Sequence, residues 1–114
     1  MKSILTSIKK LLGITEDYTV YDTDLIIYIN SVLAILTDLG IGPAEGFVIT
    51  DASATWEDFL GDTKRLESVK SYVYMKVKLV FDPPQSSAVI ASFEKLIAEF
   101  EWRANVAAET QSKT

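Results

Sequence analysis

The sequence contains neither cysteine nor histidine among its 114 residues. Without cysteine, the chain cannot form a disulfide, a thiolate nucleophile or a metal site with sulfur ligands. Without histidine, it also lacks the commonest general base at neutral pH and every Ser-His-Asp or Cys-His arrangement. These two absences exclude most familiar hydrolase chemistry and the usual zinc sites.

Basic residues are few: eleven Lys and Arg stand against sixteen Asp and Glu, which gives a formal net charge of −5. A protein that binds nucleic acid tightly neutralises phosphates with clustered Lys and Arg. The charge balance therefore disfavours tight binding of DNA or RNA. It also disfavours adhesion to an anionic membrane surface.

The sequence has no apolar run that approaches the ~20 residues needed to cross a bilayer. Lys9 and Lys10 interrupt the apolar N-terminal stretch before it reaches the length of a signal-peptide core. Its spacing instead predicts a short amphipathic helix, capped by Ser3 and stopped by Gly13. We expect no secretory signal, no membrane segment, and a chain that is used in a cytoplasm-like compartment.

Apolar residues make up 48% of the chain, enough for one hydrophobic core in a protein of this size. We expect a single helical domain over residues 1–108, followed by a flexible polar tail over residues 109–114. So small a core buries a modest share of the unfolded chain's surface. Association with partners could therefore add to its stability.

A second, longer helix is predicted to end at Leu39, and Asp22, Thr23 and Asp24 are its N-cap candidates and first-turn acids. Ile27 stands on its otherwise polar face, either as an ordinary exposed residue or as a subunit contact. After it, three glycines and a proline predict a long loop from Gly40 to Thr55. Within this loop, residues 47–49 could form a short extended piece. The glycines match no phosphate-binding fingerprint.

The C-terminal half predicts a helical hairpin. After a short helical turn that begins at Thr55 and ends near Gly61, a third main helix should open at Asp62 or Thr63 and end at Phe81. The Asp82-Pro83-Pro84 corner stops it, and Ser86 or Ser87 then caps the last helix. The fold class is therefore all-α: a small bundle of about four helices, with the long loop between the second helix and the hairpin.

The third helix is apolar around most of its circumference. Such a helix must be covered on more than one side, either by its own domain or by a neighbouring subunit. A neighbour would be expected to contact the Val69–Val80 helix and the loop from Gly40 to Thr55.

Carboxylates are the remaining candidates for catalysis. Acids at helix starts already have a structural role in capping and in the helix dipole. A glycosidase pair of carboxylates would need a deep cleft, which so small a domain hardly provides. The two closest sets are Glu16, Asp17, Asp22 and Asp24, and, separately, Glu57, Asp58 and Asp62.

Aromatic and basic residues alternate in the third helix, as in some proteins that bind single-stranded nucleic acid. The set comprises Lys70, Tyr72, Tyr74, Lys76 and Lys78. At helical spacing these residues spread around the helix instead of sharing one face. Trp102 and Arg103 are better interpreted as anchors for packing or for an interface. We therefore predict no catalytic, cofactor-binding or metal-binding residues, and no enzyme.

The order of features is nevertheless distinctive. It comprises the segment Lys9 to Ile14, the acids Asp17, Asp22 and Asp24, the helix Leu25 to Leu39 closed by Gly40-Ile41-Gly42, and paired C-terminal helices broken by Phe81-Asp82-Pro83-Pro84. This order resembles the phage head-tail connector family, the small neck adaptor proteins of long-tailed bacteriophages. The resemblance spans nearly the whole chain.

The resemblance implies an all-helical structural protein of the virion neck, assembled in the host cytoplasm. It implies a ring of identical subunits, a dodecamer, that docks beneath the portal protein after DNA packaging. That ring would offer a platform to the next neck or tail-completion protein, and DNA would pass through it without specific binding. No cofactor and no membrane are implied.

Ring closure requires two different patches on each subunit to meet head to tail, which suits a helix that is apolar on many sides. One alternative stays open from the residues alone. A small helical regulatory or protein-binding module could hold a partner helix in a groove. The two hypotheses differ in stoichiometry.

Overall fold

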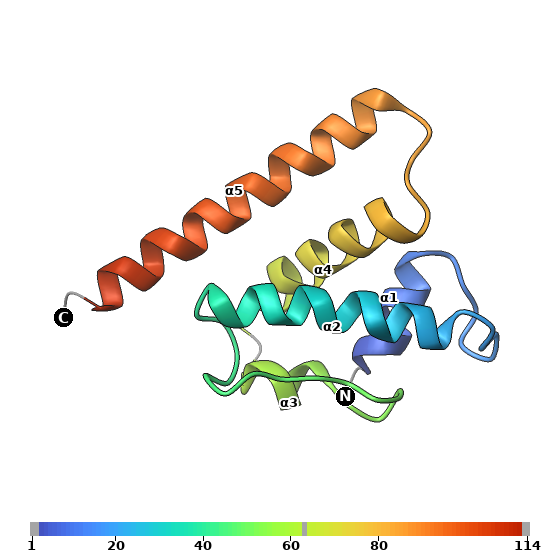
Figure 1. Cartoon of the computed structure of the whole chain (residues 1–114), viewed down its shortest axis with the longest axis horizontal. Helices are drawn as coiled ribbons and strands as arrows, with labels where there is room; N and C mark the ends of the chain where they lie inside the picture. Colours follow the sequence, from blue (N-terminus) through green and yellow to red (C-terminus); the bar gives the residue numbers. More distant parts are fainter. Residues whose placement is uncertain (1–2, 63, 113–114) are drawn as a thin grey trace.

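A computed structural model describes residues 3–62 and 64–112, and side chains as far as Ala108. Within these residues the chain forms α-helices and no strand, and an isolated bridge pairs Ser3 with Thr55. The predicted all-α fold is confirmed. The helices are α1 (Ile4–Leu11), α2 (Asp22–Asp38), α3 (Trp56–Leu60), α4 (Leu66–Phe81) and α5 (Ser87–Ser112) (Figure 1).

Helix α1 forms as its spacing predicts. The hydroxyl of Ser3 accepts a hydrogen bond from the amide of Thr6, and the chain turns away at Gly13 with a φ of 81°. Ile4 and Ile8 point into the core and are fully buried. The hydrophobic face of α1 therefore packs on the body of the domain.

Asp22 and Asp24 lie in the first turn of α2 as predicted, but the N-cap differs from the prediction. Asp22 lies inside the first turn, and the N-cap position is Tyr21, which makes no side-chain capping bond. The reason is a buried cation: Lys9 Nζ lies 2.9 Å from Asp22 Oδ1 and donates to the carbonyl oxygen of Glu16 at 2.9 Å. Asp22 is thus held by an ion pair with α1 instead of capping its own helix.

Helix α4 is the centre of the domain, in contact with α1, α2 and α5. Val69, Val73 and Val77 have no exposed surface. The helices of its own chain therefore cover this side of α4, and the contact of a neighbouring subunit with the rest of the helix stays a prediction. Of its apolar side chains, Val80 is the one largely exposed, at 61%.

Helix α4 also begins later than predicted. Asp62 Oδ1 accepts a hydrogen bond from the amide of Lys64 at 3.0 Å, and the helix starts at Leu66. A side chain that bonds the backbone two residues ahead stabilises a turn in competition with a helix. The other predicted start, Thr63, lies outside the described residues.

The loop from Gly40 to Thr55 is tied down along its length. The side-chain amide of Asn30 donates to the carbonyl of Ile49 at 2.9 Å and accepts from its amide at 2.8 Å. The side chain of Ile49 is buried, and the amide of Ile4 donates to the carbonyl of Ala54. Within the possible extended piece, Ile49 therefore pairs with a side chain of α2 and not with a strand. Thr55 then opens α3 with the predicted cap, which includes a reciprocal bond with Asp58.

Helices α4 and α5 form the predicted antiparallel hairpin. The ring of Tyr74 meets Phe93 with centroids 6.0 Å apart, and Tyr72 stacks on Phe100 at 4.4 Å. Ser86 caps α5 by accepting from the amide of Val89 at 3.3 Å. With 26 residues, α5 is about 39 Å long and extends well past the start of α4 (Figure 1).

The predicted tail over residues 109–114 stays a prediction. The backbone of residues 109–112 continues α5, whereas residues 113 and 114 lie outside the described residues.

Candidate interaction surfaces

The carboxylates singled out by the sequence do not converge. Asp22 pairs with Lys9, Asp58 completes the cap of α3 with Thr55, and Asp62 holds the turn before α4. Glu16, Asp17, Asp24 and Glu57 are exposed. Among the described residues, no three acidic side chains gather where they could hold a metal ion.

The aromatic and basic residues of α4 are likewise divided between different surroundings. Tyr72 is buried, while Lys70 pairs with Glu67 and Lys78 with Asp82, each at 3.3 Å. Such a set offers no continuous face on which successive bases could stack. None of the described helices is both long enough and apolar enough to span a bilayer.

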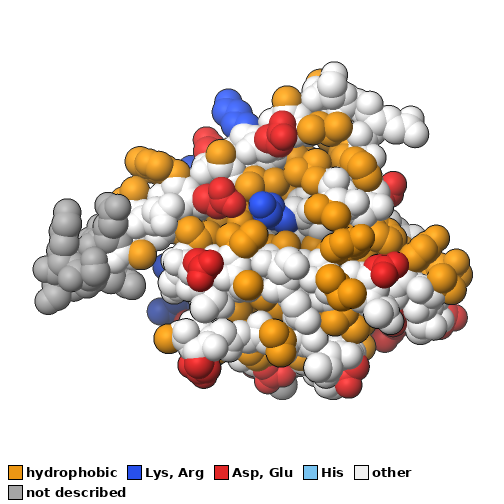
Figure 2. Space-filling view, in the orientation of Figure 1, with side chains coloured by type: hydrophobic (Ala, Val, Ile, Leu, Met, Phe, Trp, Pro, Cys, Tyr) orange, Lys and Arg blue, Asp and Glu red, His pale blue; other side chains and the backbone are white. Residues whose placement is uncertain are grey.

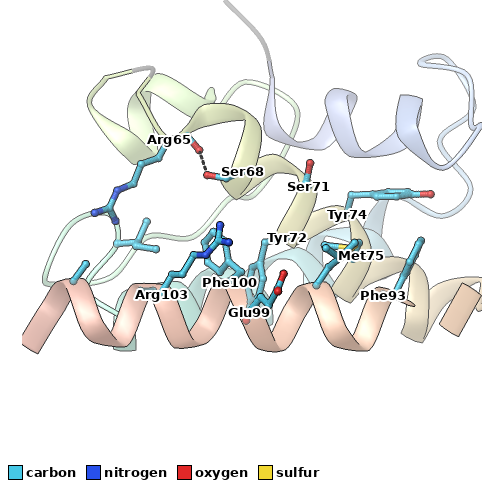
Figure 3. Close-up of a pocket in the computed structure, with 14 residues that line it drawn as sticks. Arg65, Ser68, Ser71, Tyr72, Tyr74, Met75, Phe93, Glu99, Phe100 and Arg103 are labelled. Carbon is cyan, nitrogen blue, oxygen red and sulfur yellow. Dashed lines mark hydrogen bonds between the residues drawn. The ribbon is translucent and has the colours of Figure 1, made fainter. Parts of the chain in front are cut away.

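A groove runs between α4 and α5, with a volume of about 620 Å³ (Figure 3). Its aromatic and aliphatic part is formed mainly by Tyr74, Met75, Phe93 and Phe100 from the two facing helices. The full set of lining residues is Ile41, Arg65, Ser68, Ser71, Tyr72, Tyr74, Met75, Phe93, Leu96, Glu99, Phe100, Arg103, Ala104 and Ala107. The groove is therefore a mainly apolar depression, bounded by a few polar side chains.

Two arginines lie at the end of this groove away from Phe93. Arg65 reaches toward it from the start of α4, and Arg103 from the middle of α5 (Figure 3). Both side chains are exposed, and within the described part of the chain neither forms an ion pair. This end of the groove consequently presents two arginines without an ion-pair partner among the described residues, with Glu99 the acidic side chain of the lining.

Tyr72 fixes the wall of the groove. Its hydroxyl donates to Glu101 Oε2 at 2.6 Å, which ties α4 to α5 across the hairpin. Burial raises the pKa of the Tyr72 hydroxyl far above its ordinary value, and the hydrogen bond and negative charge of Glu101 raise this pKa further. The hydroxyl therefore stays protonated and keeps donating at neutral pH.

A second apolar surface lies on the connection between α1 and α2. Tyr18, Val20 and Tyr21 are exposed there, and Val20 has 69% of its surface free. The rings of Tyr18 and Tyr21 lie 5.8 Å apart, and Tyr21 contacts Phe81 of α4 edge to face at 5.1 Å. Figure 2 shows hydrophobic side chains gathered at this end of the molecule.

Trp102 forms a third exposed site, on the outer side of α5. Two residues along a helix differ by about 200° in direction, so Trp102 points away from Phe100 and from the core. Its side chain is 67% exposed. The sequence left packing and interface open for this residue, and the described chain leaves most of its surface uncovered.

Sequence reasoning missed both the groove and the surface at Tyr18 and Val20. The groove depends on how α5 lies against α4, which periodicity does not reveal. The second surface did carry a signal: Tyr18, Val20 and Tyr21 stand close together in a segment without helical spacing, directly after Glu16 and Asp17. Apolar side chains in such a segment are either buried by the fold or available to a partner.

Comparison with known proteins shows the family of this chain. The model of the family described as phage connector protein matches residues 4–111. No curated protein and no solved structure matches the chain significantly. Because the family match covers all five described helices almost completely, the chain belongs to the phage connector protein family.

Proposed function

We propose that this protein is a head-tail connector subunit that forms a ring under the portal protein and links the DNA-filled capsid to the tail. The observation that carries the proposal is the family match over residues 4–111. The role is structural and positional, and no step of it requires catalysis. The protein would reside in the neck of the virion after assembly in the host cytoplasm.

The distribution of exposed apolar residues supports assembly. Soluble monomers rarely expose clustered apolar side chains without a use for them. Here they lie at the α1–α2 connection, along the α4–α5 groove, and around Trp102 on the outer side of α5. A ring subunit needs two different patches for its neighbours and further surface for the proteins above and below it. Two of the three sites could serve the two neighbours, and the third a protein above or below the ring.

The charge of the chain suits a ring through which DNA slides. A net charge of −5 provides no excess of cations to hold phosphates by counterion release. We propose that DNA passes this protein without specific binding. The partners are then other copies of the chain, in a dodecamer, the portal on one side, and a neck or tail-completion protein on the other.

Native mass spectrometry and sedimentation of the purified chain, with and without the portal protein of the same phage, test the proposal. We expect a ring, or a complex that forms only when the portal is present. A chain that remains monomeric and shows no affinity for the portal would overturn the proposal. That result would leave a small helical protein-binding module as the remaining function.

Deleting the gene from the phage provides an independent test. If the protein connects head and tail, the lysate should contain DNA-filled heads and separate tails, visible by negative-stain electron microscopy. Supplying the chain from a plasmid should restore complete virions. Normal virions without the protein would contradict the proposed role.

A further inference from the structure

We infer that the α4–α5 groove of one subunit receives the α1–α2 connection of the next subunit. The connection consists of residues 14–21 and is called the acidic loop below. In this contact Tyr18 and Val20 enter the groove, and Glu16 and Asp17 approach Arg65 and Arg103. The inference rests on the proposed function, since it identifies which surfaces join neighbouring subunits of the ring.

The chemistry of the groove selects its occupant. The part near Tyr74 and Phe93 is aromatic and would gain from burying apolar side chains. The opposite end carries Arg65 and Arg103, which form no ion pair among the described residues. Glu99 also lines the groove, one turn before Arg103, so the two arginines exceed it by one positive charge. The matching segment must therefore combine exposed apolar side chains with carboxylates beside them.

The acidic loop has that combination. Tyr18 is 47% exposed and Val20 is still more exposed, so both have apolar surface to bury. Glu16 and Asp17 precede them directly, and their carboxylates form no ion pair within the described chain. Because the two patches of one chain carry opposite charges, two copies should join by different patches and not by identical ones.

The acidic loop is also held in one shape. Lys9, almost completely buried, donates to the carbonyl oxygen of Glu16 and pairs with Asp22 at the other end of the loop. Tyr21 is anchored on Phe81. A segment that is ordered before binding loses less conformational entropy when it docks. The buried lysine thus positions the loop for its partner.

The acidic loop and the arginine end of the groove lie at opposite ends of α2. The acidic loop precedes Asp22, and Ile41 of the groove follows the end of the same helix (Figure 1). A helix of 17 residues is about 25 Å long, so a subunit cannot bring the carboxylates of its own loop to its own two arginines. A second copy can. Repetition of one such head-to-tail contact closes into a ring when the rotation per subunit allows it.

Disulfide trapping tests this contact, because the native chain has no cysteine. A Val20→Cys protein is mixed with a Leu96→Cys protein in the presence of the portal and oxidised. Both positions are largely exposed, with Leu96 lining the groove. The matched control pairs Leu96→Cys with Ile27→Cys, whose site is exposed on α2 outside both surfaces. Circular dichroism checks that each variant is folded.

We expect roughly tenfold more mixed dimer from the Val20→Cys pair than from the control, because docking raises the effective concentration of the two thiols. Adding Arg103→Glu to the Leu96→Cys protein should reduce the yield to the control level. Adding Asp17→Lys to the Val20→Cys protein should then restore a large part of it, since the charges are exchanged.

A yield no higher than that of the control would overturn the inference. So would a disulfide between Leu96→Cys and a cysteine introduced into the portal protein, formed in place of the mixed dimer. Portal binding separates the two levels of the argument. If the Arg103→Glu protein and the parent chain both bind the portal while the mixed dimer is absent, the contact is wrong and the proposed function stands. If the parent chain does not bind the portal either, the proposed function fails.

Discussion

Tyr72 of α4 and Glu101 of α5 are joined by a hydrogen bond of 2.6 Å, and this bond stands beside the groove that we assign to subunit contact. The two residues are separated by 29 positions in the chain, and the ring of Tyr72 stacks on Phe100 one position before Glu101. The bond therefore sets the distance between the walls of the groove. A change at Tyr72 should alter both stability and the groove.

Replacing Tyr72 with phenylalanine should lower the free energy of unfolding by about 1–2 kcal/mol, because a hydrogen bond to a charged acceptor is lost while the ring remains. Urea denaturation measures the change. Tyr74→Phe is the matched control, since the Tyr74 hydroxyl makes no side-chain hydrogen bond within the described residues. Equal effects of the two substitutions would show that the bond contributes nothing specific.

The same tyrosine predicts how stability changes at high pH. The pKa of Tyr72 is raised in the folded protein above its ordinary value of 10.0, so the neutral hydroxyl favours the fold. This contribution is fully present below pH 10 and is lost as the pH rises from 10 toward the folded-state pKa. Denaturation at several pH values should therefore show the difference between the native chain and Tyr72→Phe shrinking above pH 10. A constant difference would contradict the assignment.

Lys9→Met should destabilise the protein by about 1–3 kcal/mol, because it leaves Asp22 and the carbonyl of Glu16 without their buried cation. The loss stays below that of a fully buried pair, since the Asp22 side chain is partly exposed. Lys10→Met is the control: Lys10 is exposed and should change stability by less than about 0.5 kcal/mol.

Hydrogen exchange distinguishes the role of Lys9 in the loop from its role in the whole fold. Amides of residues 14–21 should exchange faster in Lys9→Met than the change in global stability explains. Unchanged exchange in that segment would mean that other contacts, such as that of Tyr21 with Phe81, suffice to hold it.

Asn30→Ala should cost about 2–3 kcal/mol, because both backbone groups of Ile49 lose their partner in a partly buried site. The loop around Ile49 should also lose protection from hydrogen exchange. Ser31→Ala is a suitable control on the exposed neighbour. If Asn30→Ala behaved like the control, water would be an adequate substitute for the amide.

Gly42→Ala should be more destabilising than Gly46→Ala, although both glycines have positive φ. An added Cβ at Gly42 would collide with the buried ring of Phe59, whereas at Gly46 it would meet nothing within 4 Å. Gly46→Ala then measures the backbone cost, about 1–2 kcal/mol, and Gly42→Ala should exceed it by about 1–3 kcal/mol. Thermal or urea denaturation of the pair tests the difference.

Much of the fold could be read from local patterns. Ser3, Thr55 and Ser86 cap helices as their side chains predict, since capping depends on residues within one turn. The proline corner after Phe81 likewise places the hairpin. The start of α2 could not be predicted, because Asp22 has a distant partner, Lys9, that competes with capping.

The sequence by itself determined the class of the protein. The lack of cysteine and histidine, the acidic balance and the helical spacing establish an all-α chain with little scope for catalysis, and the order of its segments indicates the connector family. These features are local or compositional. The exposure of particular residues was decided only by the tertiary structure, which buries Val69 within one subunit and leaves Tyr18, Val20 and Trp102 free. Burial depends on which helices lie against each other, and that is a property of the packed core as a whole.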